Sequence, residues 1–444
     1  MNRAVVVGAG LAGSEAAWQL AQRGVAVTLY EMRPEHRSPA HHTPLFAELV
    51  CSNSLRGAAL STAPGLLKEE LRRTGSLLMQ CADRCAVPAG GALAVDRERF
   101  SELVTARLSG HPLITVVRER VTAVPDGEAV VIASGPLTEG ALADSIAQTL
   151  GQSQPLHFYD AAAPIVSFAS IDMDKAYFAS RYNKGEADYI NCPMDREQYL
   201  SFVEELKRAE EAPVHGFEDK KVFEGCMPVE VMARRGVDTL RYGPMKPVGL
   251  RDPRTGARPY AVVQLRADNA QKSMYNMVGF QTHLRFPEQK RVFSMIPGLE
   301  NAEFLRYGVM HRNSFLRSPG LLDRYYRVIG QERLWFAGQI TGVEGYIESA
   351  ASGLCVGINL ARRLSGRALI DFPPETALGA LAGHISTENR DFQPMNINFG
   401  LLPPMPERIR GKRERYMALA QRALERLETL RPLYQEDLQS ENHT

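Results

Sequence analysis

The order of hydrophobic and polar positions predicts a parallel β-α-β unit near the start of the chain. Residues 4–7 are a short apolar run of the kind found in buried strands, and a glycine-rich turn follows them. A helical pattern then continues to residue 21, and Gly24 ends it. Residues 25–31 form a second apolar run that closes on Glu31. Two strands joined by a helix in this order lie parallel in one sheet.

The same pattern divides the rest of the chain into three parts. Helices are predicted over 68–79 and 96–108, and strands over 113–117, 118–124 and 129–136. From about 158 to 305 the alternation of strands and helices disappears, and it resumes with a strand at 333–338 and an apolar helix over 343–361. We therefore expect a parallel α/β domain, residues 1–157 and 306–444, interrupted by a smaller mixed α/β insertion, residues 158–305. An insertion of this kind commonly supplies substrate contacts.

The turn after the first strand has the spacing G-x-G-x-x-G, carried by Gly8, Gly10 and Gly13. The first glycine permits the tight turn, the second lets the backbone approach a pyrophosphate, and the third lets the helix pack against the strand. The helix N-terminus offers unpaired N–H groups to the phosphates. Glu31 follows at the place, about 20 residues on, where a carboxylate binds a ribose hydroxyl. We expect a Rossmann-like dinucleotide site here, in preference to a glycine-rich turn that binds no nucleotide.

A strand, a glycine turn and a small-residue helix return late in the chain, through Gly338 and Gly342. Many FAD enzymes carry such a second half, with the helix N-terminus near the flavin, so this feature favours FAD over NAD. Because G-x-G-x-x-G does not recur, a nicotinamide cofactor would act without a dinucleotide domain of its own. The residues predicted to bind the cofactor are Gly8, Ala9, Gly10, Leu11, Ala12, Gly13, Glu31, Met32, Arg33, Gly338, Gln339, Gly342, Glu344, Gly345 and Tyr346.

Composition narrows the class of protein without defining it. The 444 residues carry a net charge of +1, so nucleic-acid binding would need local basic patches. One such patch is a basic, helically spaced segment after residue 409, which fits either an amphipathic helix docked on the core or an RNA-contacting face. We expect no secretory signal and no membrane span. The six cysteines form no C-x-x-C pair, which suits reduced thiols in the cytoplasm and predicts no metal site.

Two cysteines lie in surroundings that suit a reactive thiol. Cys51 stands among serine, asparagine and arginine residues, whose donors can steady a thiolate. Cys226 lies in a glycine- and proline-containing loop between two carboxylates, with a basic segment after it. For either cysteine alone, an inert thiol is the ordinary interpretation. Cys81 and Cys85, one helical turn apart, are interpreted as buried small side chains.

Several blocks together resemble one family, the folate- and FAD-dependent tRNA (uracil-5-)-methyltransferases. The resemblance extends over essentially the whole chain and is far more specific than the glycine motif. Its blocks are residues 8–20, 31–34, 47–54, 224–228, 307–313, 338–346 and 395–400.

The resemblance implies a reaction that makes ribothymidine at uridine 54 in the T loop of tRNA. The carbon would come from 5,10-methylenetetrahydrofolate and the electrons from NADPH or NADH, both through the bound flavin. Carbon 5 of uracil becomes nucleophilic once a thiolate adds to carbon 6, and its proton must later leave to a base. By resemblance, Cys226 attacks and Cys51 has the acid–base role; the reverse assignment stays open.

The resemblance also suggests substrate contacts. His311 and Tyr346 are expected to flank the pterin ring, although His311 also fits a polar residue at a domain edge. The tRNA would be gripped through its phosphates, with the target base swung out of its stack. Arg234, Arg235, Lys246 and the basic C-terminal helix are the expected contacts.

Two other classes of protein remain open at this point. One is the flavoprotein relative that modifies the wobble uridine of tRNA, or a general flavin oxidoreductase, in which neither cysteine is essential. The other is a tRNA-binding protein that keeps FAD only as a structural element and catalyses nothing.

Overall fold

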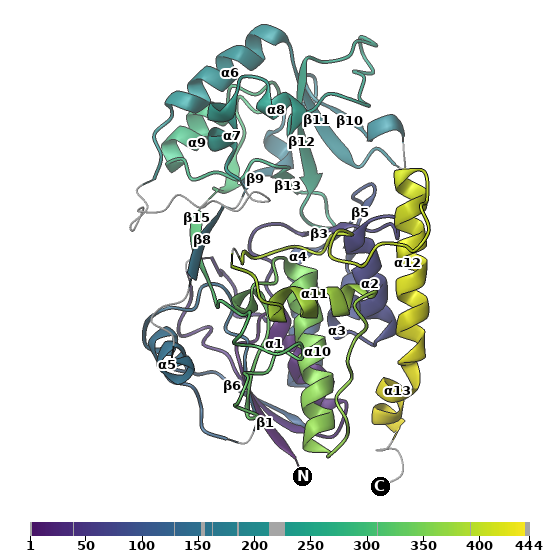
Figure 1. Cartoon of the computed structure of the whole chain (residues 1–444). Coiled ribbons are helices and arrows are strands. Elements are labelled where there is room, and N and C mark those ends of the chain that lie inside the picture. The colour runs from purple at the N-terminus through teal and green to yellow at the C-terminus, as the bar shows by residue number, and fades with distance from the viewer. Residues whose placement is uncertain are drawn as a thin grey trace.

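The computed structural model describes residues 2–38, 40–127, 129–151, 156–161, 163–183, 186–212, 227–308, 310–390 and 392–439. In Figure 1 the chain forms two lobes. The first lobe contains both termini and a parallel sheet, and the second lobe, at the top of the view, contains an antiparallel sheet.

The first lobe is organised around a five-stranded parallel sheet with the order β16-β7-β1-β2-β6. Val5 pairs with Thr28 on one side and with Val130 on the other, so the first strand lies in the middle. The strand after residue 333 joins the same sheet beside β7, as the pattern predicts. The strands are β1 (Arg3–Val7), β2 (Ala26–Tyr30), β6 (Ile114–Val117), β7 (Val130–Ile132) and β16 (Leu334–Phe336).

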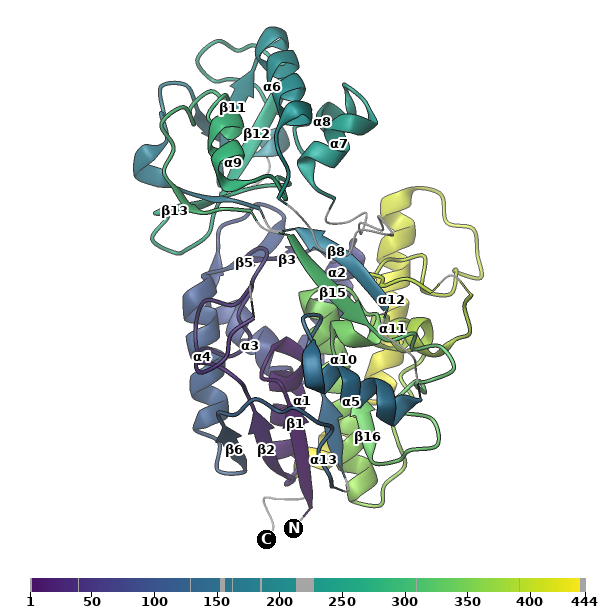
Figure 2. The same ribbon diagram turned by 90° about the vertical axis from the view of Figure 1, so that its left-hand side faces the viewer.

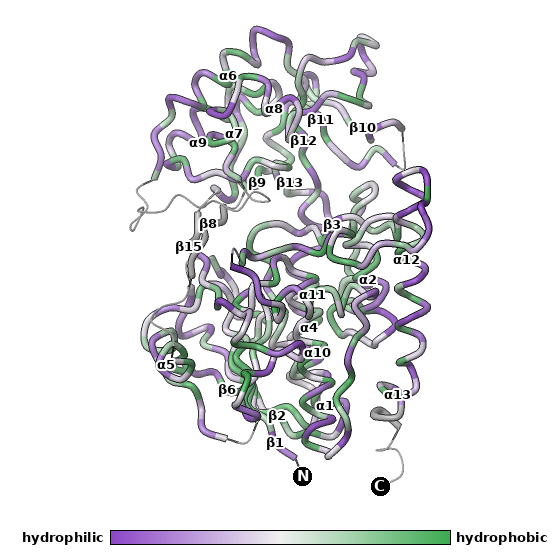
Figure 3. Tube along the Cα trace, viewed as in Figure 1, coloured by the Kyte–Doolittle hydropathy of each residue, from purple (hydrophilic) through white to green (hydrophobic). Residues whose placement is uncertain are grey.

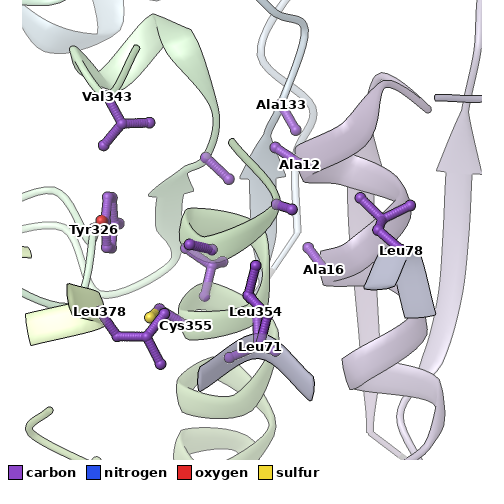
Figure 4. Packing of buried hydrophobic residues seen from close by; sticks show 14 of the residues in the cluster. Ala12, Ala16, Leu71, Leu78, Ala133, Tyr326, Val343, Leu354, Cys355 and Leu378 are labelled. Atoms are coloured by element: carbon purple, nitrogen blue, oxygen red, sulfur yellow. The ribbon is translucent and has the colours of Figure 1, made fainter. Parts of the chain in front are cut away.

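The helices of the first lobe pack on this sheet and on one another. They are α1 (Leu11–Ala21), α2 (Ala63–Arg73), α3 (Leu77–Arg84), α4 (Arg97–Ser109), α5 (Gly140–Leu150), α10 (Tyr346–Leu364) and α11 (Ala377–Ser386). The first and last thirds of the chain meet where α1 packs on α10 (Figure 4). A Cβ atom at Gly353 would lie 2.1 Å from the carbonyl oxygen of Ala12, so the two helices approach at backbone distance.

The second lobe contains a six-stranded sheet with the order β10-β11-β12-β13-β9-β14, in which neighbouring strands are antiparallel. Its strands are β9 (Ile165–Ser167), β10 (Tyr177–Ala179), β11 (Tyr189–Met194), β12 (Ala261–Ala267), β13 (Met274–Met277) and β14 (Phe304–Arg306). Its helices are α6 (Arg196–Arg208), α7 (Val229–Arg235), α8 (Thr239–Tyr242) and α9 (Phe286–Phe293). The sheet and helices enclose a separate apolar cluster. The predicted fold class, a Rossmann-like α/β domain with a smaller mixed insertion, is confirmed.

Two antiparallel strands connect the lobes, β8 (Leu156–Ala161) and β15 (Met310–Phe315) (Figure 2). They pair from Leu156 opposite Phe315 to Ala161 opposite Met310. The chain thus leaves and re-enters the first lobe at one place. The domain boundaries given above stay a prediction: β8 lies across the first of them, whereas the second falls within β14, a few residues before β15.

Two predicted elements differ in the structure. Residues 118–124 form no strand, because the chain turns away after the edge strand β6 and the Arg118 guanidinium donates to the carbonyls of Arg33 and Pro44, both at 2.9 Å. The helix predicted over 68–79 is two helices. Gly75, with a φ of +79°, separates them, and the Ser76 hydroxyl caps α3 by accepting from the N–H of Met79.

The C-terminal segment forms α12 (Lys412–Thr429) and α13 (Arg431–Gln439). Helix α12 buries Leu419, Ala420, Ala423, Leu424 and Leu427, and it contacts α2. Its remaining surface is largely hydrophilic (Figure 3). The pattern after residue 409 is therefore an amphipathic helix docked on the first lobe, with an outer face that carries both basic and acidic residues.

Candidate active site

The glycine turn after β1 has the geometry that the motif predicts. Gly8 lies in the left-handed region, with a φ of +99°. A Cβ atom at Gly8 would lie 2.6 Å from the carbonyl oxygen of Ala133, and one at Gly13 would lie 1.8 Å from the carbonyl oxygen of Gly8. A Cβ atom at Gly10 would meet no described atom within 4 Å. Packing therefore requires the first and third glycines, and the second leaves space at the N-terminus of α1.

Glu31 follows β2 and lies beside this turn. One of its carboxylate oxygens accepts from the N–H of Ala9 at 3.0 Å, and the Arg33 guanidinium donates to both oxygens, at 2.7 and 3.1 Å. Burial acts to raise the pKa of Glu31, but the hydrogen bonds and charge of Arg33 outweigh it, and the pKa lies below its ordinary value. Arg33 also donates to Glu48 at 3.1 Å. Glu31 is thus a fixed anion, and it accepts from the N–H of Ala9, one of the residues predicted to bind the cofactor.

The second glycine turn leads into α10 with a similarly constrained backbone. Gly338, Gly342 and Gly345 have φ values of +88°, +87° and +114°. A Cβ atom at Gly342 would lie 2.4 Å from the Phe392 ring, so this position admits no larger residue without a shift. Three positions of the turn therefore require glycine. The turn that they form brings the start of α10 to the cavity described below.

Tyr346, the first residue of α10, binds the segment 50–53, here named the Cys51 loop. Its hydroxyl oxygen accepts from the N–H of Cys51 at 2.7 Å and from that of Ser52 at 3.2 Å. Burial raises the pKa of Tyr346 well above its usual value, so the hydroxyl keeps its proton. The Cys51 side chain is half-buried. Two predicted site residues that are far apart in sequence thus lie in contact.

A cavity of about 540 Å³ runs along both glycine turns. The predicted residues that line it are Gly8, Gly10, Leu11, Ala12, Glu31, Met32, Arg33, Cys51, Gly338, Gln339, Glu344, Gly345 and Tyr346. Ala9, Gly13 and Gly342 are not among the described lining residues. They affect the cavity indirectly: Ala9 donates to Glu31, and the two glycines allow the close packing of the two turns.

The remaining predicted residues lie elsewhere. Cys226 is outside the described residues. His311 is placed by its backbone in β15, opposite Asp160 of β8. Arg234 and Arg235 end α7, where Arg234 forms an ion pair with Glu211, and Lys246 follows α8. None of these three basic residues is among the described lining residues of the cavity.

Sequence reasoning missed several polar residues at the cavity. Arg56 lines it in a left-handed conformation, with a φ of +64°, and pairs with the fully buried carboxylate of Glu348. Lys68 does not line the cavity, but it lies close enough to Arg56 for that charge to act on it. It donates to the carbonyl oxygen of Leu55 at 2.7 Å, and burial lowers the pKa of Lys68 to about 7. Asn396 also lines the cavity, and its membership of the block 395–400 was the available signal.

Two further properties of the described residues bear on function. The described residues contain no group of three histidine, cysteine or acidic side chains that could hold a metal ion. No helix in the part of the chain that the structure describes is long and apolar enough to cross a membrane.

The fold and the cavity together define the class of protein. A central parallel sheet, a glycine turn at the N-terminus of α1, an acid after β2 and a returning second half are the features of a two-lobed dinucleotide-binding protein of the flavoprotein type.

Comparison with known proteins is consistent with this class. The family model described as "Glucose inhibited division protein A" matches residues 3–368. A methylenetetrahydrofolate--tRNA-(uracil-5-)-methyltransferase of Enterococcus faecalis is 61% identical over 425 residues, which are 96% of this chain and 97% of the relative. The enzyme of the same name from Pelotomaculum thermopropionicum is 62% identical over 424 residues, 95% of this chain and 97% of the relative. The chain belongs to this family, among its methylenetetrahydrofolate--tRNA-(uracil-5-)-methyltransferase members.

Solved structures extend the likeness of fold. The structure of Aquifex aeolicus GidA has a TM-score of 0.71 and covers 99% of this chain and 74% of its own, at 16% sequence identity. At that identity the likeness shows a common fold only.

Proposed function

We propose that this chain transfers a one-carbon unit from methylenetetrahydrofolate to carbon 5 of a uracil in tRNA, with FAD as its resident cofactor. The observation that carries the proposal is the meeting of the Cys51 loop with Tyr346 on a cavity that begins at the dinucleotide turn. The names of its near-full-length relatives specify the same reaction. Uridine 54 of the T loop as the target, and NADPH or NADH as the reductant, belong to the proposal.

The residues present fit FAD. The space at Gly10 and the N-terminus of α1, which no side chain caps, suit a pyrophosphate, and the carboxylate of Glu31 suits a ribose. The turn from Gly338 to Tyr346 borders the same cavity and brings the N-terminus of α10 to it. When bound, FAD supplies the reduction and carries the one-carbon unit.

The protein's own groups would prepare the uracil. In the proposal the Cys226 thiolate adds to carbon 6, a carbon–sulfur bond forms, and the ring becomes an enolate that is nucleophilic at carbon 5. Cys51 then removes the proton from carbon 5 once the new carbon is attached, and the carbon–sulfur bond breaks as the product forms, which restores the double bond of the ring and the Cys226 thiolate. The role of Cys226 rests on the sequence, and that of Cys51 is supported by its place on the cavity.

The first test follows labelled carbon into tRNA. Purified protein is mixed with unmodified tRNA, NADPH and methylenetetrahydrofolate labelled in its methylene carbon, beside Cys51→Ala, Cys226→Ala and the control Cys85→Ala. The wild type and the control should form labelled 5-methyluridine at position 54. Both test variants should lose at least about a thousandfold in rate, as expected when a base or nucleophile is removed.

The rival functions predict other results. A general flavin oxidoreductase would oxidise NADPH and leave the tRNA unlabelled, and the wobble-uridine relative would place its product in the anticodon. A non-catalytic tRNA-binding protein would bind tRNA without oxidising NADPH. Any of these three outcomes would overturn the proposal. Replacing NADPH by NADH in the same assay shows which reductant the protein uses.

A further inference from the structure

Arginines of the second lobe hold the Cys51 loop on both sides of its cysteine. Arg306 in β14 donates to the carbonyl oxygen of Val50. Arg266 in β12 donates to the hydroxyl of Ser52 at 2.8 Å and to the side-chain oxygen of Asn53 at 3.0 Å. With Tyr346 binding the N–H groups of the loop from the first lobe, its backbone is fixed from both lobes.

A third arginine, Arg97 at the start of α4, lies in the same place with incomplete pairing. One of its terminal nitrogens donates to Asp268 at 2.8 Å, and its Nε and other terminal nitrogen are buried with no described hydrogen-bond partner. Burial lowers the pKa of Arg306, and the nearby charge of Arg97 lowers it further. Cys51 is also close enough to act on Arg306, and it raises that pKa. Arg97, Arg266 and Arg306 are named the arginine cluster.

The arginine cluster carries more positive charge than its described surroundings compensate. Asp268, 2% exposed, is the carboxylate that pairs with it. Three other groups face it. The Tyr189 hydroxyl accepts a hydrogen bond from Arg266, and Tyr346 stays protonated. Burial, followed by the charge of Arg306, lowers the pKa of His42. Glu48 lies nearby, but Arg33 and backbone N–H groups bind its carboxylate. Buried charge that lacks a partner is costly.

The Cys51 thiol is the described group placed to supply a negative charge. None of the three guanidiniums is among the described lining residues of the cavity, and the two unpartnered nitrogens of Arg97 are closed to solvent. An anion arriving through the cavity would therefore meet Cys51 before the arginine cluster, since Cys51 lines the wall. A thiol beside arginine side chains ionises more readily than one in water.

We propose that the arginine cluster positions Cys51 and favours the thiolate form of its side chain. The inference rests on the proposed function for the step that it serves. A thiolate can take the proton from carbon 5 of the uracil: the carbon–hydrogen bond breaks, its electron pair stays with the ring, and a sulfur–hydrogen bond forms on Cys51. Arg97, Arg266 and Arg306 are thus positioning residues, which act through the cysteine.

The test measures the ionisation of Cys51 directly. The full chain with FAD bound, without tRNA or folate, is alkylated with iodoacetamide over a range of pH, and the modification of each cysteine is followed by peptide mass spectrometry. Arg306→Gln keeps a donor for Val50 and removes the charge, whereas Arg306→Lys keeps both. Arg97→Gln is the second variant, and Cys226 in the same sample is the reference thiol.

The two glutamine variants should raise the pH midpoint of Cys51 alkylation by at least about one unit, a tenfold lower reactivity near neutral pH. Arg306→Lys should stay near the wild type, and the Cys226 profile should not move. An unchanged Cys51 midpoint in both glutamine variants, or equal shifts at Cys51 and Cys226, would overturn the inference. Because no substrate is present, this result is independent of whether labelled carbon reaches tRNA.

Discussion

The glycines in the turn after β1 are required for different physical reasons, although the motif does not distinguish them. At Gly13 a side chain would collide with the backbone of Gly8, whereas at Gly10 it would project into the cavity. The first constraint acts on folding, and the second acts on the ligand. The difference is testable with one added methyl group.

Gly13→Ala should destabilise the protein by about 1–3 kcal/mol, because the new Cβ atom overlaps a carbonyl oxygen that cannot move without distorting β1. Gly10→Ala should leave the stability of the FAD-free protein within about 0.5 kcal/mol and weaken FAD binding at least tenfold. Denaturant unfolding and titration of FAD into the stripped protein measure the two effects. If both variants lost stability equally, Gly10 would not face a ligand space.

The cysteines are also distinguished residue by residue. Burial raises the pKa of Cys81 and of Cys192 to about 12, and it raises the pKa of Cys355 further. These thiols stay protonated near neutral pH, so a sequence count of six cysteines overstates the number that can react. The interpretation of Cys81 as a buried small side chain agrees with its 2% exposure.

At the scale of elements, a charged network ties α7 to the segments before and after it. His283 forms ion pairs with Glu211 at 2.5 Å and with Glu230 of α7 at 2.6 Å. Backbone bonds accompany them, from Ala212 to the carbonyl of His283 and from Val229 to that of Gln281. Residues 212 and 229, on either side of the segment that contains Cys226, are therefore held by one stretch of chain.

This network predicts a dependence of stability on pH. Burial opposes the charge on His283, but Glu211 and Glu230 outweigh it and raise its pKa to about 9. A group whose pKa is raised on folding stabilises the folded protein. This contribution is complete at pH values below the pKa of the unfolded state, about 6.5, and it is lost as the pH rises through 9. The unfolding free energy of the wild type should exceed that of His283→Gln by ~2 kcal/mol at pH 6 and converge with it above pH 9.

The exposed His36 provides the matched control, since His36→Gln should change stability little at any of these pH values. A difference between wild type and His283→Gln that did not vary with pH would show that His283 acts by packing alone.

The sequence predicted elements well where a local pattern settles them. The parallel strands β1, β2, β7 and β16 and the helices α1, α4 and α10 lie where periodicity places them, within a few residues. The sequence pattern did not reveal the break at Gly75, because apolar positions continue across it. The break depends on the cap that Ser76 provides at the start of α3. Residues 118–124 have the alternation of a strand, but none of the strands that the structure describes pairs with them.

At the scale of the whole molecule, the site depends on contacts that no local pattern contains. The sequence located both glycine turns and Cys51, because each belongs to a recognisable block. It could not reveal that Tyr346 binds the Cys51 loop, or that Arg266 and Arg306 bind it too, with Arg97 close to Arg306. Those residues lie on separate elements of both lobes, and only the folded topology brings them together.

We expect the proposed tRNA substrate to contact exposed basic residues at the start of α12 and just before it. Reversing the charge of the exposed residues Arg410, Arg413 and Arg415 together should weaken tRNA binding about tenfold or more and lower the salt dependence of the affinity by about one unit per lost phosphate contact. The melting temperature should not change, because the apolar face of α12 stays intact. Binding measured at several salt concentrations tests this.

Arg208→Glu on α6, where the side chain is 71% exposed, is the control for a change of charge alone. Equal losses of tRNA affinity in the control and in the triple variant would mean that α12 is a solvated helix without a specific role in RNA binding.

The paired strands β8 and β15 have an evolutionary consequence. Because the chain leaves and returns through adjacent antiparallel strands, the two points of exit and re-entry lie side by side. A short turn could join them, so one ancestral nucleotide-binding core could have gained, lost or exchanged its second lobe in a single genetic event without altering the strand order of its parallel sheet. Substrate choice could then diversify among descendants while the chemistry of the core was inherited unchanged.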